Sequence, residues 1–139
     1  MKKPLSVLLG FALTALVFIS CQRNNATPSI QSQLVGKWIV KNAVSHSIVQ
    51  GVPYQDTTAY TTADYLDFHA DSTLTIVISG GTYTGKWSIV NSRLFISETN
   101  YMDWPNGWDL PVLTRTDLQM LYKETSQSAS LDAYLNLYR

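Results

Sequence analysis

Hydrophobic residues follow two different patterns along this chain. Residues 5–19 form a nearly unbroken apolar run, whereas from residue 34 onward apolar and polar positions alternate with a period of two. This alternation is typical of strands that turn one face toward a core. The residues expected to face inward are Trp38, Val40, Val44, Leu66, Phe68, Leu74, Ile76, Ile78, Trp87, Ile89, Leu94, Ile96, Leu118, Met120, Tyr122, Leu131, Ala133, Leu135 and Leu137. Helical spacing is nearly absent, so the pattern predicts an all-β domain.

Short segments separate the predicted strands. Residues 70–72, 79–81, 90–92 and 125–130 are rich in the residue types that tolerate turn backbones. Short strands at near-regular spacing indicate an antiparallel meander. Such a sheet either packs as a small β-sandwich or closes into a barrel, and closure removes the exposed edges that invite aggregation.

The N-terminal pattern predicts a targeting signal rather than a structural element of the folded domain. Lys2 and Lys3 precede the apolar run and Ser20 ends it, which fits a secretory signal peptide over residues 1–20; the run is shorter than the roughly 18 residues of a spanning helix. Cys21, the only cysteine, follows at once. Residues 18–21 resemble a bacterial lipobox, in which the thiol is lipidated before cleavage. We therefore predict that Cys21 is the lipidated first residue of the mature chain; the alternative is a cleaved signal peptide followed by a free buried thiol.

A lipidated Cys21 fixes how the mature chain meets the membrane. Each buried CH₂ of an acyl chain contributes about 0.8 kcal/mol, so two or three chains anchor the protein without spanning the bilayer. Residues 21–33 are then the lipidated cysteine and a polar, flexible tether, whose span of about 20 Å keeps the domain close to the membrane. Because lipidation uses the only thiol, the domain over residues 34–139 is expected to have no disulfide.

Charge and motifs argue against several classes of function. Loss of residues 1–20 leaves a net charge near minus two and no basic cluster, so we expect no nucleic-acid partner. The chain has no nucleophile elbow, zinc-protease motif or phosphate-binding glycine loop, so we predict no enzyme, catalytic residue or cofactor. Asp67, His69 and Asp71 share one strand face, but we expect that face to be solvated and predict no metal site.

Four motifs together resemble a known family. They are Leu34–Trp38, which has a Gly36-x-Trp38 spacing, and residues 65–75, 85–89 and 113–120. With them the chain resembles the small lipocalin-like domains of Gram-negative envelope lipoproteins, few of which have an assigned function. The resemblance implies an eight-stranded up-and-down barrel in which Gly36 lets the chain turn and Trp38 packs across the closed end.

The resemblance also raises the question of a ligand. Larger lipocalins place an arginine from a late strand over this tryptophan, and Arg115 and Arg139 are the candidates here. An eight-stranded barrel is either filled by side chains or holds one small ligand, and the many large apolar residues of this chain favour a filled or nearly filled interior.

The longest interruption of the strand pattern is residues 101–109, which carry two of the four tryptophans. Tyr101, Trp104 and Trp108 are the ligand-binding candidates, because aromatic residues on a loop often line a barrel mouth; Asp103 and Asp109 would add polar contacts. The alternative is a plug, in which the two tryptophans simply fold back onto the barrel.

From these features we expect a lipid-anchored envelope protein that faces the periplasm from the outer membrane and binds a small apolar or amphipathic ligand. The alternative is a non-enzymatic structural subunit that docks a filled barrel on another envelope protein. For that alternative, the sequence offers an interface of exposed tyrosines at positions 54, 60, 83, 134 and 138.

Overall fold

The structure is a computed structural model that describes residues 27–139. The predicted signal peptide, Cys21 and the first part of the predicted tether lie outside the described residues. One short helix and nine strands make up the fold: α1 (Ile30–Leu34), β1 (Gly36–Val49), β2 (Val52–Ala59), β3 (Tyr65–Phe68), β4 (Thr73–Ile78), β5 (Gly81–Val90), β6 (Arg93–Ser97), β7 (Trp108–Leu113), β8 (Asp117–Thr125) and β9 (Ala129–Tyr138).

Eight of the strands close into an antiparallel barrel. Neighbours pair in the order β1-β3-β4-β5-β6-β7-β8-β9, and β9 pairs back with β1. The predicted eight-stranded barrel is therefore confirmed, and the sandwich alternative is wrong. The ninth strand, β2, lies outside this ring and was not expected from the sequence.

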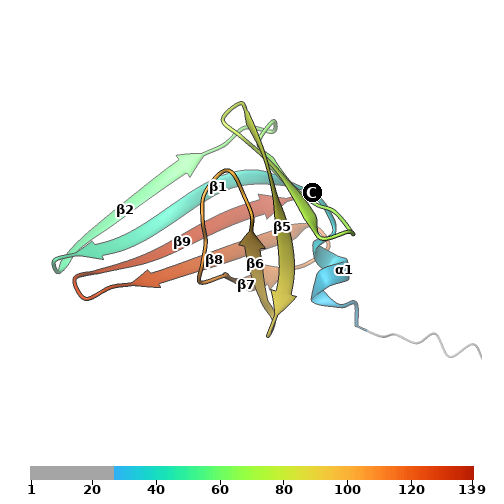
Figure 1. Ribbon diagram of the computed structural model, residues 1–139. Helices are drawn as coiled ribbons and strands as arrows, with labels where there is room; N and C mark the ends of the chain where they lie inside the picture. Colours follow the sequence, from blue (N-terminus) through green and yellow to red (C-terminus); the bar gives the residue numbers. More distant parts are fainter. Residues whose placement is uncertain (1–26) are drawn as a thin grey trace, which may run out of the picture.

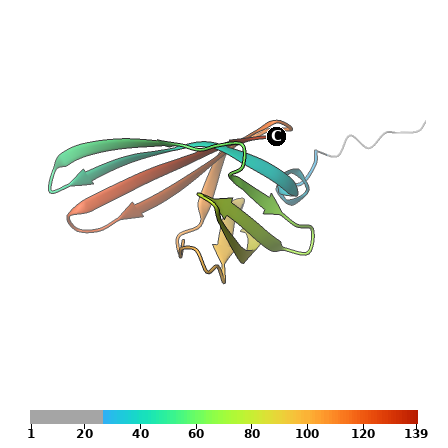
Figure 2. The ribbon, with the colours of Figure 1, turned by 90° about the horizontal axis from the view of Figure 1, so that it is seen from above.

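The length of β1 explains the position of β2. The first residues of β1, Gly36 to Ile39, pair with β3, whereas Asn42 to Val49 pair with β2 on the same side. On its other side β1 pairs with β9 along nearly its whole length. The outer part of β1 therefore belongs to a four-stranded sheet, β2-β1-β9-β8, that projects from the barrel as two adjacent hairpins (Figures 1 and 2). We call the projecting end of this sheet, residues 46–55 and 123–132, the wing.

Three strand connections are two-residue turns of one type. Gln50–Gly51, Ser79–Gly80 and Asn91–Ser92 all have positive φ at both positions. This is the backbone of a type I′ turn, whose twist matches that of the flanking strands. The turns predicted within residues 79–81 and 90–92 are thus present, whereas the one at residues 50–51 was not predicted.

The barrel interior follows the predicted alternation closely. Of the residues predicted to face inward, those that are buried are Trp38, Val40, Leu66, Phe68, Leu74, Ile76, Ile78, Trp87, Leu94, Ile96, Leu118, Met120, Tyr122 and Leu137. Ile89, Leu131, Ala133 and Leu135 are half-buried. The prediction for Val44 is wrong, because a register shift between Val40 and Asn42 reverses the alternation; Ala43 takes the inward position and Val44 the outward one.

At one end the barrel is closed by α1 and Trp38. The indole of Trp38 is fully buried and donates from Nε1 to the Leu34 carbonyl at 2.7 Å. Ser29 caps the helix by accepting a hydrogen bond from the backbone N–H of Ser32. Residues 30–33, which the sequence placed in the tether, therefore belong to the folded domain.

Arg139 lies over the ring of Trp38. Its guanidinium carbon is 3.9 Å from the ring centroid, and its nitrogens donate to the carbonyls of Arg115, Val35 and Gln33 at 2.9, 3.0 and 2.7 Å. Gly36 has a φ of +115°, and a Cβ there would lie 3.2 Å from the Arg139 Nη1 atom. Of the two candidate arginines, Arg139 thus occupies the position over Trp38.

We expect Arg139→Ala to lower the free energy of unfolding by about 2 kcal/mol, because it removes a cation–π contact and three hydrogen bonds to carbonyls. Arg139→Lys should recover only part of this loss, since an ammonium cannot reach three carbonyls in a planar fork. Chemical denaturation measures both. The matched control is Arg115→Ala, for which we expect little change; equal losses at the two positions would refute the role given to Arg139.

Candidate functional site

An apolar cavity lies inside the barrel, at the end away from α1. Its volume is about 140 Å³. Side chains from seven strands form most of its wall, among them Leu66, Ile76, Ile78, Ile96, Met120 and Leu135. The barrel is therefore nearly filled, as the composition of the chain favoured, but it retains this apolar space.

The cavity is covered by residues 98–107, the connection between β6 and β7. Tyr101, Met102 and Trp104 from this loop belong to the lining. The loop turns back through a hydrogen bond from the Gly107 N–H to the Trp104 carbonyl at 3.3 Å. Gly107 has a φ of +66°, and a Cβ there would meet the ring of Phe95 at 2.9 Å. Glycine is therefore required at the point where the loop joins the barrel.

Aromatic rings form a continuous series from the loop into the barrel. The successive centroid distances are 4.7 Å for Tyr83–Tyr101, 5.9 Å for Tyr101–Trp104, 5.6 Å for Trp104–Trp108 and 5.3 Å for Trp108–Tyr122. Such distances are favourable for tilted and edge-to-face aromatic pairs. The structure thus brings the three sequence-predicted candidates together: Tyr101 and Trp104 lie on the loop, and Trp108 is the first residue of β7. The loop covers the barrel as a plug would, yet leaves a cavity beneath it.

Trp108 differs from the other buried tryptophans in its hydrogen bonding. Trp38 and Trp87 donate from Nε1 to the carbonyls of Leu34 and His69, at 2.7 and 3.0 Å. Trp108 is 6% exposed and lines the cavity, but its Nε1 has no partner within residues 27–139. An unpaired buried donor costs about 1–3 kcal/mol. A ligand atom that accepts a hydrogen bond here would recover that cost.

Tyr60 lines the cavity, and Asp64 fixes the segment that carries Tyr60. Tyr60 is part of the lining, and burial is the main reason that its pKa is raised, followed by the nearby Tyr101 and Asp64. The Asp64 carboxylate accepts hydrogen bonds from the Thr61 N–H and hydroxyl at 2.7 and 2.8 Å, and from the Ser79 N–H at 2.7 Å. These bonds, that of the Thr61 N–H first, lower the pKa of Asp64. Asp64 therefore ties the segment that carries Tyr60 to the β4–β5 turn.

The remaining sequence-predicted polar residues lie elsewhere. Asp109 does not reach the cavity, because it pairs with Arg93 at 2.8 Å and follows Trp108 on the opposite face of β7. Asp103 is exposed. Asp71 accepts hydrogen bonds from Thr73 in its turn, and residues 27–139 bring no three potential metal ligands together. The cavity lining is thus largely apolar; its polar groups are the phenols of Tyr60 and Tyr101 and the unpaired N–H of Trp108.

No family model, curated protein or solved structure matches the chain. Within residues 27–139, no helix is both long and apolar enough to cross a bilayer. The function is therefore inferred from the site itself.

We expect Asp64→Asn to lower stability at neutral pH. Both carboxylate oxygens of Asp64 now accept hydrogen bonds, whereas an amide has only one acceptor oxygen. The pKa of Asp64 is lowered in the folded state, so its stabilisation is complete above the unfolded pKa of about 3.9 and is lost as the pH falls through the folded pKa. The difference in unfolding free energy between the two proteins should thus be constant from about pH 7 to 5 and shrink below about pH 4. Denaturation at a series of pH values measures this; a difference that persists unchanged to about pH 2 would contradict it.

Proposed function

We propose that the protein is a lipid-anchored envelope protein of the lipocalin-like type that binds a small amphipathic molecule in its barrel. The ligand places an apolar group in the cavity and a hydrogen-bond acceptor at Trp108 Nε1. The observation that carries this proposal is a largely apolar cavity whose wall includes Trp108, a residue with an unpaired, buried indole N–H.

The cavity volume limits the size of the enclosed group. Engineered apolar cavities of about 150 Å³ bind benzene or xenon, whereas sites for drug-sized ligands span about 300–1,000 Å³. The space of about 140 Å³ therefore suits one six-membered ring or a short alkyl chain. The remainder of a longer ligand would extend out of the cavity past the covering loop, where Met102 is 54% exposed.

The donor in the wall should select among apolar ligands. A pocket that offers an unpaired hydrogen-bonding group favours a ligand that satisfies it over an isostere that does not. Two probes of similar size make the comparison: cyclohexanone, which accepts but does not donate, and methylcyclohexane, which does neither.

We expect the affinity for cyclohexanone relative to methylcyclohexane to be about tenfold higher in this protein than in Trp108→Phe, since one recovered hydrogen bond contributes about 1–1.5 kcal/mol. The measurement is NMR of the indole N–H signals of the protein comprising residues 27–139. The Trp108 signal should move as cyclohexanone is added. The Trp38 and Trp87 signals are internal controls, because their N–H groups are already bonded.

Trp108→Phe provides the matched variant for this comparison. It keeps an aromatic ring at the site but removes the donor, so cyclohexanone should bind about tenfold more weakly to it while methylcyclohexane binds as before. Failure of both probes to bind the unsubstituted protein would rule out the proposal.

The anchor is the second part of the proposed function. The apolar run, Ser20 and Cys21 support lipidation of Cys21, and α1 then begins only nine residues after the lipid. The folded domain would stand close to the bilayer. Because no acidic segment follows Cys21, we place the protein in the outer membrane, facing the periplasm.

We expect Cys21→Ser to abolish incorporation of radiolabelled palmitate and to release the protein from the membrane fraction. Two or three acyl chains supply nearly all of the membrane affinity in this account. Ser20→Ala, which keeps a small residue before the cysteine, is the control and should still be labelled. Palmitate labelling of the Cys21→Ser protein would contradict the assignment.

A second candidate function, docking on another envelope protein, is favoured by the wing. Ile48, Val49, Val52 and Tyr54 are between 44 and 57% exposed around the β1–β2 hairpin, and exposed apolar clusters often mark interfaces. The interface of five exposed tyrosines expected from the sequence is wrong in part, because Tyr60, Tyr83, Tyr134 and Tyr138 are half-buried.

A further inference from the structure

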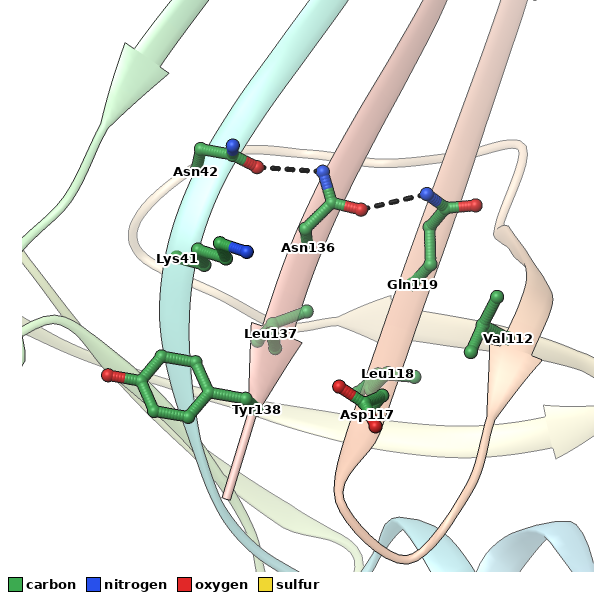
Figure 3. A pocket seen from close by; sticks show the side chains of 9 residues that line it. All are labelled: Lys41, Asn42, Val112, Asp117, Leu118, Gln119, Asn136, Leu137 and Tyr138. Carbon is green, nitrogen blue, oxygen red and sulfur yellow. Dashed lines mark hydrogen bonds between the residues drawn. The ribbon is translucent and has the colours of Figure 1, made fainter.

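A shallow groove of about 630 Å³ crosses the outer face of the barrel over β1, β9, β8 and β7. It is separate from the cavity, because the two share no lining residue and the polar side chains of the groove lie on the outward face of the strands. Its polar side chains are Lys41, Asn42, Asp117, Gln119 and Asn136, and Tyr138 adds an aromatic ring (Figure 3). The cavity and its proposed ligand do not explain why these polar side chains gather here.

Three amides form a hydrogen-bonded row across the groove. Asn136 pairs in register with Asn42 on one side and with Gln119 on the other. Gln119 Nε2 donates to Asn136 Oδ1 at 2.8 Å, and Asn136 Nδ2 donates to Asn42 Oδ1 at 2.7 Å (Figure 3). The row therefore has two unlike ends: Asn42 Nδ2 presents donors, and Gln119 Oε1 presents an acceptor. Neither end has a side-chain or backbone partner within residues 27–139.

Register shifts flank this row on both sides. In β1 the shift between Val40 and Asn42 gives Lys41 and Asn42, which are consecutive, positions at the same groove. In β7 a shift between Asp109 and Val112 precedes the residue that faces Gln119. Bulges redirect side chains and are frequent beside functional sites. Here the shift in β1 adds Lys41 to the groove beside Asn42, and the shift in β7 sets Val112 opposite Gln119.

The groove carries one positively and one negatively charged side chain. Lys41 lies beside the donor end of the amide row, and Asp117 lies two residues before Gln119 on β8, at the acceptor end (Figure 3). A cation and an anion of equal charge favour a neutral ligand over an ionic one. The groove thus offers donors, acceptors and an aromatic side chain, with no net charge.

We propose that this groove binds a neutral oligosaccharide. Sugar hydroxyls both donate and accept, so they can satisfy Asn42 Nδ2 and Gln119 Oε1 together, while the apolar face of a sugar ring lies against Tyr138. Strands spaced about 4.8 Å apart place the two ends of the row roughly 10 Å from each other, the length of about two linked hexose rings. The ligand class is therefore an oligosaccharide rather than a single sugar.

Titration of the full chain with cellotriose, maltotriose and chitotriose tests this proposal. The protein is held in a phosphocholine detergent, whose headgroup contains no sugar. We expect at least one of the three sugars to shift the side-chain NH₂ signals of Asn42, Asn136 and Gln119 in a saturable way, at concentrations up to the order of 10 mM. No shift of these signals with any of the three sugars would overturn the proposal.

The variant Asn42→Asp separates sugar recognition from the fold. Its carboxylate still accepts the hydrogen bond from Asn136, so the row survives, but the free donors at its end are lost. We expect binding to weaken about tenfold. Gln127→Glu makes the same change of amide to carboxylate on an exposed turn and should bind like the unsubstituted protein. Unchanged binding by Asn42→Asp, or equal weakening in both variants, would overturn the proposal.

Discussion

The pairing of β1 with β9 determines where the other parts of the domain lie. It joins the first and last strands through ten residue pairs and so closes the barrel. Adjacent pairs of this ladder serve different surfaces: Ala43 and Leu135 line the internal cavity, whereas Asn42 and Asn136 lie in the outer groove. Because side chains alternate between faces, a slip of one residue would exchange the two sets. The register between β1 and β9 therefore places both candidate sites.

The same ladder positions the two extreme ends of the domain. At the closed end, β9 finishes next to the start of β1, and this brings Arg139 over Trp38 and against the carbonyls of Gln33 and Val35 at the end of α1. Beyond the barrel, the ladder continues into the wing, where β2 and β8 pair on its outer sides. One long antiparallel pairing thus connects the end cap, the cavity wall and the projecting sheet.

The barrel was predictable from the sequence because its interior imposes a period of two. A strand that has no buried face needs no such alternation. Every residue of β2 is exposed, so the sequence pattern does not mark this strand. Val44 was misassigned because a bulge at Lys41 reverses the alternation without any sequence signal. Residues 30–33 are polar enough to suggest a tether, but the buried Leu34 and the carbonyls bonded by Arg139 make them part of the domain.

The candidate sites were predictable to different degrees. Tyr101, Trp104 and Trp108 stood out because aromatic residues interrupted the strand pattern, and the structure gathers them at the cavity. The unpaired N–H of Trp108 depends on the positions of every neighbour, and the amide row joins residues 94 positions apart; neither has a local sequence signal.

Dissolved xenon probes whether the closed barrel holds an accessible apolar cavity. We expect saturable shifts in the methyl NMR signals of Leu66, Ile76 and Leu135, with no shift for Leu74, which is buried elsewhere in the core. Absence of any saturable shift, or equal shifts at all four residues, would contradict this expectation.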